Sequence, residues 1–388
     1  MKIVKKKDRT RLGIDARILS QPMNGVARHL ILLLKSLAKK KEFEVFLFSD
    51  TPLMEEYSPY FSGYRLILFD RPGLKKYWKN WVLPFQLSKH RIDLYHSVWD
   101  KGVPLISPCP VVMSIHDLYS ISGENKTAKK SKKARRRIGL LLETLKAKKI
   151  MTISESTRIE IIEKLRVPPE KVVAAYLDCD RQYIKDAASR EDGRDLPYGL
   201  AAGGYFISVA GRLDDVRKNT PFLIRSFSKF LGRHPGPGIK LVVVGSYDAS
   251  SGPFIALKKL AAEYNIEKDV VFTGYVPDGV LYNLIRRSIA VIFTSTFEGF
   301  GIPILEAFAL GAPVITSDRS SMREIASGGS ALLVDPASEE NLVSAMSSLV
   351  SDTSLRKRLS ENGRKRLGDF DWNIAMEKIT DVYYDILR

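Results

Sequence analysis

Residues 296–307 read Thr296-Phe297-Glu298-Gly299-Phe300-Gly301-Ile302-Pro303-Ile304-Leu305-Glu306-Ala307, and this stretch is the most informative in the chain. It follows the apolar run 290–294, which is typical of a buried strand in a parallel sheet. Two glycines precede a proline suited to the first turn of a helix, and Gly311 stands where that helix should end. Such a turn presents free N–H groups and a positive dipole end. The stretch therefore predicts a strand, a phosphate-binding turn and a helix.

Two glutamates belong to this stretch. Glu298 would lie on the loop before the helix, and Glu306 would lie about one turn inside it. Because open α/β sheets bind ligands at the carboxyl ends of their strands, both carboxylates are candidate ligand contacts there. Two solvated surface charges are the alternative interpretation. The surrounding strand, glycines and proline favour the site.

A second strand-to-helix turn carries cations. Residues 209–219 follow the strand-like run 205–209 and contain Gly211, Arg212 and Lys218. Arginine offers a planar fork of donors and lysine a point charge, and both suit a diphosphate. A solvated basic turn is the alternative, and the presence of residues 296–307 disfavours it.

Short β-branched runs alternate with amphipathic stretches along the whole chain, which is typical of parallel sheets covered by helices. The strands expected in the first half are residues 12–16, 44–48, 65–69, 93–96, 111–115, 150–153 and 172–175. Those expected in the second half are residues 205–209, 240–244, 270–273, 290–294, 313–316 and 331–334.

Two segments define the expected domains. The stretch 181–204 is rich in Asp, Gly, Ala and Arg and shows no sustained periodicity, so residues 191–204 are expected to form a linker. Residues 1–190 and 205–370 would then form the two domains. The segment 371–388 is expected to form a helix that packs back on the first domain, because apolar residues recur there at helical spacing. They are Trp372, Ala375, Met376, Ile379, Val382, Tyr383 and Ile386.

Composition and charge narrow the class of protein. The 388 residues are 45% hydrophobic, enough for domains with their own cores. The net charge of +17 is uneven, since residues 1–200 hold 39 basic and 23 acidic residues and residues 201–388 hold 22 and 21. Only the first half should attract an anionic partner at long range. The two cysteines, Cys109 and Cys179, fit a reducing compartment. Without a signal-peptide pattern, we expect a cytoplasmic protein with at most peripheral membrane contact.

Taken together, the motifs resemble those of the retaining glycosyltransferases of family 4, also called glycosyl transferases group 1. The matching segments are Gly211-Arg212, Lys218-Asn219, residues 298–306, 311–315, 24–28, 116–118 and 152–155. The resemblance spans nearly the whole chain and is more specific in the second half. It implies the α/β fold called GT-B, with two facing Rossmann-like domains, parallel sheets and a C-terminal helix that crosses back to the first domain.

The resemblance also implies roles in binding a nucleotide-diphosphate sugar. Arg212 and Lys218 would hold the donor diphosphate and neutralise the charge that develops when the glycosidic bond breaks. Glu306 would accept hydrogen bonds from the ribose, and Glu298 would contact hydroxyls of the sugar. Further donor contacts are expected at Gly211, Tyr275, Val276, Phe300, Gly301 and Ile302.

In the first domain, the resemblance implies that Asn24 and Gly25 form a loop that approaches the diphosphate, although this dipeptide also suits a tight turn. His116 would be the active-site histidine beside the sugar and the acceptor, with Asp117 able to orient it. An ordinary structural histidine is the alternative. The reaction would retain the anomeric configuration through departure and attack on one face of the sugar.

We expect no metal and no other cofactor. The segments Asp178-Cys179-Asp180 and Asp369-Phe370-Asp371 both read Asp-x-Asp, a pattern that can hold a divalent ion. One opens the linker and the other precedes the terminal helix, so neither has the surroundings of a metal site. Arg212 and Lys218 would already serve the diphosphate.

Basic and aromatic residues gather in the first half. The run Lys126–Arg137 precedes the apolar residues 138–142, and the run Lys75–Trp81 interleaves lysines with aromatic side chains. Both patterns predict docking on an anionic membrane surface. A solvated loop is the alternative.

The expected function is transfer of a hexose, with mannose preferred by analogy, from a UDP- or GDP-linked sugar to a glycan or lipid-linked acceptor in envelope polysaccharide or glycolipid synthesis. A small soluble acceptor is the alternative. A nucleic-acid-binding protein would explain the basic first half, but the sequence shows no nucleic-acid module, so no nucleic acid is expected as a partner. A non-catalytic scaffold would leave His116, Arg212, Lys218, Glu298 and Glu306 unexplained.

Overall fold

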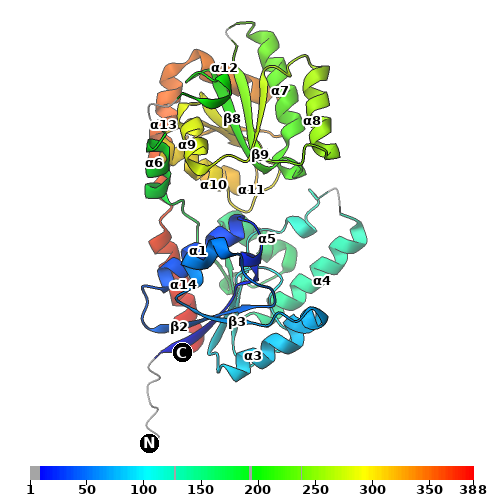
Figure 1. Ribbon diagram of the computed structural model, residues 1–388, viewed down its shortest axis with the longest axis vertical. Helices are drawn as coiled ribbons and strands as arrows, with labels where there is room; N and C mark the ends of the chain where they lie inside the picture. The colour runs from blue at the N-terminus through cyan, green and yellow to red at the C-terminus, as the bar shows by residue number, and fades with distance from the viewer. Residues whose placement is uncertain (1–8, 126–127, 192–194, 237) are drawn as a thin grey trace, which may run out of the picture. The chain divides into compact units, whose positions relative to one another are not determined.

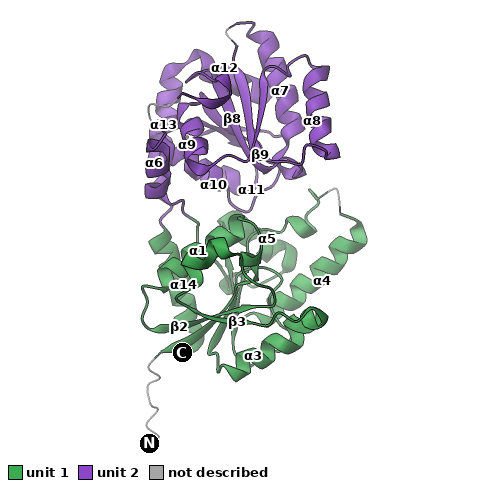
Figure 2. Cartoon of the chain, viewed as in Figure 1, with its two compact units in different colours: residues 1–177, 372–388 green, residues 178–371 purple. Residues whose placement is uncertain are grey.

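A computed structural model describes residues 9–125, 128–191, 195–236 and 238–388. The chain forms two compact units, which Figure 2 colours separately. Unit 1 comprises residues 1–177 and 372–388, and unit 2 comprises residues 178–371. Each unit is a parallel sheet covered by helices (Figure 1), as the alternating sequence pattern predicts.

Unit 1 contains a seven-stranded sheet with the order β3-β2-β1-β4-β5-β6-β7. Its strands are β1 (Thr10–Asp15), β2 (Phe43–Ser49), β3 (Arg65–Leu68), β4 (Leu94–Ser97), β5 (Val111–Ile115), β6 (Lys149–Thr152) and β7 (Val172–Ala174). All five residues of β5 are buried, because a central parallel strand is covered on both faces.

Helices cover both faces of this sheet. They are α1 (Gly25–Leu37), α2 (Ser58–Phe61), α3 (Leu83–Lys89), α4 (Lys130–Lys146), α5 (Glu155–Leu165) and α14 (Trp372–Leu387). The shorter turns are η1 (Arg17–Ser20), η2 (Glu55–Tyr57), η3 (Pro72–Tyr77), η4 (Trp78–Val82), η5 (Tyr119–Ile121) and η6 (Pro169–Lys171). Alternate residues of β2 serve two core clusters, one with α1 and α14 and one with α3, α4 and α5.

The terminal helix α14 belongs to unit 1. The middle of its apolar stripe is buried, and Trp372 and Ile386 at its ends pack against the same core. Trp372 Nε1 donates to Ser36 Oγ at 2.7 Å, and the Tyr383 hydroxyl lies 2.7 Å from Nδ1 of buried His96. Apolar packing and these polar contacts together hold the helix on the first part of the chain.

Unit 2 contains a six-stranded sheet with the order β10-β9-β8-β11-β12-β13. Its strands are β8 (Tyr205–Arg212), β9 (Lys240–Ser246), β10 (Val270–Gly274), β11 (Ala290–Phe293), β12 (Val314–Ser317) and β13 (Leu332–Val334). Its helices are α6 (Arg181–Ser189), α7 (Thr220–Arg233), α8 (Gly252–Glu263), α9 (Asp278–Arg287), α10 (Ile302–Leu310), α11 (Ser320–Ile325), α12 (Glu339–Ser351) and α13 (Thr353–Leu367). The short turns are η7 (Pro197–Gly199) and η8 (Val216–Lys218).

The boundary between the units differs from the expected one at residue 190. It lies between Leu177 and Asp178, and α6 belongs to unit 2. Ile184, Ala187 and Ala188 are buried where α6 packs against α9 and α10. Residues 192–194 of the expected linker lie outside the described part of the chain, and residues 195–204 lead into β8 within unit 2. The buried stripe of α6 is short and rich in alanine, and charged residues surround it in the sequence, so the sequence pattern does not predict this helix.

Within the described residues, no helix is long and apolar enough to cross a membrane.

Candidate functional site

The shortest link between the two motif stretches is an ion pair in unit 2. Lys218 Nζ lies 2.6 Å from Oε1 of Glu298, although the two residues are 80 positions apart in sequence. Their side chains are only 17% and 14% exposed. The Lys218 ammonium also lies 5.0 Å from the centre of the Phe293 ring, a favourable cation–π arrangement. The structure thus joins the carboxyl ends of β8 and β11 through one cation and one carboxylate.

The backbone of the β8–α7 turn explains the position of Lys218. Gly211 adopts φ 68° at a shift in the β8–β9 register, a conformation that a residue with a Cβ rarely adopts. Asn219 ends η8 with φ 57° and begins α7, and its Nδ2 donates to Pro336 O at 2.9 Å. Asparagine is among the residues that tolerate this region best. The backbone conformations of Gly211 before Lys218 and of Asn219 after it therefore fix the shape of the turn.

Arg212 has a different environment from Lys218. Its side chain is 73% exposed, and Nε and Nη2 donate to the two carboxylate oxygens of Asp214 at 2.9 and 2.5 Å. Hydrogen bonding to Arg212 lowers the pKa of Asp214 below its usual value. Arg217 is likewise paired with Asp215 at 2.7 Å. Both arginines of the turn therefore already have a carboxylate partner.

The turn after β11 leads into α10 as the sequence predicts. Gly301 precedes the helix with φ 130°, and Pro303 occupies its first turn. Oγ of Ser321 on α11 lies 2.8 Å from the carbonyl oxygen of Glu298 and 2.6 Å from that of Phe300, and its one proton can be donated to either of them. This hydroxyl therefore holds the loop that carries Glu298. The backbone at Gly301 and Ile302 lies at the start of a helix, where N–H groups have no partner within the helix.

Glu306 lies on α10 and is almost fully buried. The Tyr282 hydroxyl of α9 donates to Oε1 of Glu306 at 3.5 Å. Burial raises the pKa of the Cys179 thiol, and the negative charges of Asp178 and Glu306 add to that shift. Glu298 thus contacts Lys218, whereas Glu306 contacts a different element of unit 2.

Two other expected donor contacts follow β10. Tyr275 is 80% exposed, whereas Val276 is buried. The Tyr275 side chain is therefore open to a ligand, and the backbone contacts that the resemblance implies for this turn stay a prediction.

In unit 1, Asn24 and Gly25 form the start of α1 and not a tight turn. Oδ1 of Asn24 accepts hydrogen bonds from the backbone N–H groups of Val26 and Ala27, both at 3.0 Å. Asn24 is therefore the N-cap of a 13-residue helix, and Gly25 is the first residue of that helix. A Cβ on Gly25 would meet no atom within 4 Å, so the position is open.

His116 follows β5, as expected, but a second histidine contacts it. Its Nε2 lies 2.9 Å from Val98 O and 3.4 Å from Nδ1 of His29. Desolvation lowers the pKa of His116, and burial lowers that of His29 well below its usual value, so both rings are neutral at pH 7. Oδ1 of Asp117 accepts from the Tyr119 N–H at 2.9 Å. The ring of His116 is thus oriented by Val98 and His29.

The Asp-x-Asp segments have other partners. Asp178 pairs with Arg181 at 3.3 Å, Asp180 caps α6, and Asp369 pairs with Arg366 at 2.7 Å. Throughout the parts of the chain that the structure describes, no group of three or more His, Cys, Asp or Glu side chains is arranged to hold a metal ion.

Sequence reasoning missed several polar partners, namely His29, Asp214, Tyr282 and Ser321. Ser321 follows β12 closely, so its place near the carboxyl end of a strand could have indicated it. His29 lies on α1, 87 positions from His116, and no local signal joins the two.

Two family models match the chain. Glycosyltransferase family 4 matches residues 23–177, and glycosyl transferases group 1 matches residues 197–366. Among curated relatives, the O-antigen chain mannosyltransferase B of Escherichia coli is 28% identical over 61% of this chain and 60% of its own length. The D-inositol 3-phosphate glycosyltransferase of Corynebacterium jeikeium is 29% identical over 56% of this chain and 52% of its own length. The matches therefore span little more than half of these relatives.

Solved structures resemble the whole chain. Anabaena HepE in complex with UDP and glucose has a TM-score of 0.76 at 19% identity, covering 97% of this chain and 100% of that chain. A sucrose-phosphate synthase from Thermosynechococcus elongatus has a TM-score of 0.76 at 18% identity, covering 97% and 99%. These likenesses establish the fold, and the expected GT-B architecture is confirmed. With both family models matched in order along the chain, the protein belongs to the group 1 glycosyltransferases of the family 4 type.

Proposed function

We propose that the chain transfers a hexose from a nucleotide-diphosphate sugar, with retention of the anomeric configuration and without a metal ion. The observation that carries this proposal is the Lys218–Glu298 pair, 2.6 Å apart at the meeting point of two strand-to-helix turns. It supplies one cation for a diphosphate and one carboxylate for sugar hydroxyls in adjacent positions.

In the free protein these two groups neutralise each other. A diphosphate would compete with Glu298 for the Lys218 ammonium, because it carries more negative charge in a compact group. The carboxylate would then be released to accept hydrogen bonds from the donor sugar, while Lys218 stabilises the charge on the departing diphosphate. Arg212 would add a second cation by leaving Asp214 in the same manner. Its high exposure leads us to expect a smaller effect than that of Lys218.

Other donor contacts would come from backbone and from Glu306. The backbone at Phe300, Gly301 and Ile302 would meet the phosphates or the sugar, and that at Gly211, Tyr275 and Val276 would also contact the donor. Glu306 would accept hydrogen bonds from the ribose hydroxyls. Its burial beside Tyr282 keeps the carboxylate in one orientation, and such preorganisation lowers the entropy lost on binding.

On unit 1, the start of α1 at Asn24 and Gly25 would approach the diphosphate, and neutral His116 would lie beside the sugar. Departure of the nucleotide and attack of the acceptor on one face would retain the anomeric configuration. Proton NMR of the first product formed tests this step directly, since inversion of the anomeric signal would contradict it.

We favour a UDP- or GDP-linked donor, with mannose preferred, and a glycan or lipid-linked acceptor in envelope polysaccharide or glycolipid synthesis. The name of the E. coli relative supports mannose and a polysaccharide. The name of the C. jeikeium relative instead favours a second candidate, a small soluble phosphorylated polyol as acceptor.

The experiment is a transfer assay in EDTA. Purified protein is incubated with UDP- and GDP-linked hexoses and with a membrane lipid extract or inositol phosphate, and products are identified by mass spectrometry. We expect one donor to be consumed with a glycolipid product. A product on inositol phosphate alone would assign the second candidate, and a strict requirement for added magnesium would contradict the metal-independent mechanism.

A further inference from the structure

Helix α4 has an apolar ridge that none of the described residues of unit 1 covers. Ile138, Leu142 and Leu145 recur at i, i+4 and i+7 and share one face, where Leu145 is 73% exposed. Leu140, Glu143 and Thr144 are buried on the opposite side of the helix. The helix carries seven basic residues and a single carboxylate, that of Glu143. A surface helix of a globular protein that contacts only water would normally have polar residues at these three positions.

A second ridge lies on η3, η4 and α3. Tyr77, Trp81 and Phe85 recur at every fourth position, and all three are exposed, Trp81 to 73%. Between these helices along the chain, the loop that contains Leu105 and Ile106 exposes 78% of Ile106. The eight side chains are named here the apolar face, which comprises Tyr77, Trp81, Phe85, Leu105, Ile106, Ile138, Leu142 and Leu145.

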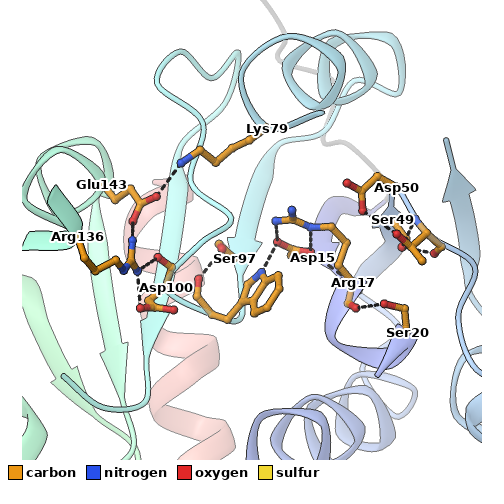
Figure 3. A network of polar contacts seen from close by, with 12 residues as sticks. Asp15, Arg17, Ser20, Ser49, Asp50, Lys79, Ser97, Asp100, Arg136 and Glu143 are labelled. Atoms are coloured by element: carbon orange, nitrogen blue, oxygen red, sulfur yellow. Dashed lines mark hydrogen bonds and ion pairs between the residues drawn. The ribbon is translucent and has the colours of Figure 1, made fainter. Parts of the chain in front are cut away.

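Polar contacts hold these three segments together. Lys79 of η4 and Arg136 of α4 both point toward buried Glu143, at 2.8 and 3.3 Å, and Arg136 also contacts Asp100 (Figure 3). The Leu105 N–H donates to Oδ1 of Asn80 at 3.1 Å. These polar contacts therefore connect the three segments that carry the apolar face.

Residues 104–111, together with Lys146 and Lys148, line an open cavity of about 460 Å³. Its walls are mostly proline and aliphatic side chains, and its two charged groups are both cations. A cavity with apolar walls and two ammonium groups suits an anionic head group attached to an apolar chain.

The structure changes three details of the membrane docking that the sequence predicts. The basic residues from Lys130 onward lie on α4 itself and not on a preceding loop, and Lys126 falls outside the described residues. Trp78 is buried in the core, so it does not contribute to a surface. Lys75 and Lys79 are paired with Asp70 and Glu143.

We propose that the apolar face docks on an anionic lipid surface, with the Lys146–Lys148 cavity receiving a lipid phosphate. Charge complementarity selects this partner, because α4 contributes six basic residues beyond Arg136 and its one carboxylate is buried and already paired. Aromatic and basic side chains together are typical of a membrane interface. The inference is independent of the donor chemistry proposed above.

The test is flotation of the full chain with vesicles, in the absence of any sugar donor. One set of vesicles is phosphatidylcholine, and the other is an equimolar mixture of phosphatidylcholine and phosphatidylglycerol. We expect flotation with the mixed vesicles only, and less of it at high salt. Leu145→Ser should lower the partition coefficient about fivefold or more. Lys146→Gln and Lys148→Gln should each lower it about fivefold.

Matched controls come from α8 of unit 2, where Ile255 is 53% exposed and Lys258 and Lys259 are exposed. Ile255→Ser and Lys258→Gln/Lys259→Gln should leave flotation unchanged. Lipids with brominated acyl chains should quench tryptophan fluorescence, and Trp81→Phe should remove most of the quenching while the protein still floats.

Three results would overturn the proposal. The first is no flotation with either vesicle at low salt, and the second is an equal loss of flotation in the α8 controls. The third is a dimer in light scattering that Leu145→Ser dissociates, without vesicle binding, since this would assign the face to a second copy of the chain.

Discussion

The two units use their basic residues in opposite ways. Around the β8–α7 turn of unit 2, Arg212, Arg217 and Lys218 are each paired with a carboxylate. Helix α4 of unit 1 carries seven basic residues and one carboxylate, that of Glu143, beside an exposed apolar ridge, and Arg136 of α4 forms a salt bridge with Glu143. A paired cation responds only to a ligand that displaces its partner, whereas a surplus of cations attracts any anionic surface at long range. Unit 2 is therefore suited to a specific small ligand and unit 1 to an extended partner.

The largest effect is expected from breaking the Lys218–Glu298 pair. Lys218→Ala should lower kcat/KM about 100- to 1,000-fold, as loss of a transition-state charge contact typically does. The free energy of unfolding should fall by about 3 kcal/mol, because the change leaves the Glu298 carboxylate, which is only 14% exposed, without its cation. Steady-state kinetics and urea unfolding measure the two quantities.

Lys229 of α7, the helix that follows η8, provides the control, since it pairs with Glu339 at 2.7 Å. Lys229→Ala should leave kcat/KM unchanged. An activity loss in Lys218→Ala no larger than its loss of stability predicts would contradict the assignment.

Substitutions of Glu298 and Glu306 should distinguish contacts to the donor sugar from contacts to the nucleotide. Glu298→Gln keeps the shape of the side chain but removes its charge, so kcat should fall about tenfold or more. The affinity for the free nucleotide should not fall and should rise, because the diphosphate no longer competes with a carboxylate for Lys218. Glu306→Gln should weaken nucleotide binding about tenfold, because a charged acceptor at the ribose is lost. Calorimetry with the nucleotide alone and kinetics with the sugar donor distinguish the two. If Glu298→Gln weakened nucleotide binding and Glu306→Gln lowered only kcat, then Glu298 would contact the nucleotide and Glu306 the sugar.

Acid should destabilise unit 1. Burial lowers the pKa of His96 to about 3 and that of His29 well below its usual value. Below about pH 6.5 the unfolded chain binds protons that the folded histidines do not, so stability falls as pH falls, by up to about 1.4 kcal/mol per pH unit for each histidine. For His96 this loss continues down to about pH 3.

This acid effect has a probe that reports on one unit. The four tryptophans, Trp78, Trp81, Trp99 and Trp372, all belong to unit 1. Urea unfolding followed by tryptophan fluorescence should show a midpoint that decreases between about pH 7 and about pH 5. A midpoint that stays constant over this range would rule out the buried neutral histidines.

The smallest effect is expected at the start of α1. Asn24→Ala removes an N-cap with two hydrogen bonds and should cost about 1 kcal/mol of stability. Asn24→Ser should recover most of that loss, because serine caps helices nearly as well. If Asn24→Ser unfolded as easily as Asn24→Ala, the capping role would be wrong.

Much of the fold could be predicted because parallel strands are buried on both faces and form short apolar runs. The strands of both sheets match the expected ranges to within three residues. Helix α6 could not be predicted, since its stripe of Ile184, Ala187 and Ala188 is short and weakly apolar. Its membership of unit 2 depends on contacts with α9 and α10, which are remote in sequence.

The candidate site was predictable in its residues but not in its pairings. The strand-to-helix turns identify Lys218 and Glu298, because glycines and a helix start follow apolar runs. That these two side chains contact each other depends on β8 and β11 being neighbours in the sheet. In the same way, His116 could be placed at the end of β5, but its contact with His29 depends on how α1 packs.

The central claim is that the β8–α7 and β11–α10 turns of unit 2 bind a nucleoside diphosphate without a metal. Calorimetric titration of the full chain with UDP, GDP and ADP, each in EDTA, tests it most directly. The account predicts saturable binding of one of the three at one site per chain, and loss of that binding in Lys218→Ala. No binding of any of them by the folded protein, or equal binding by Lys218→Ala, would contradict it.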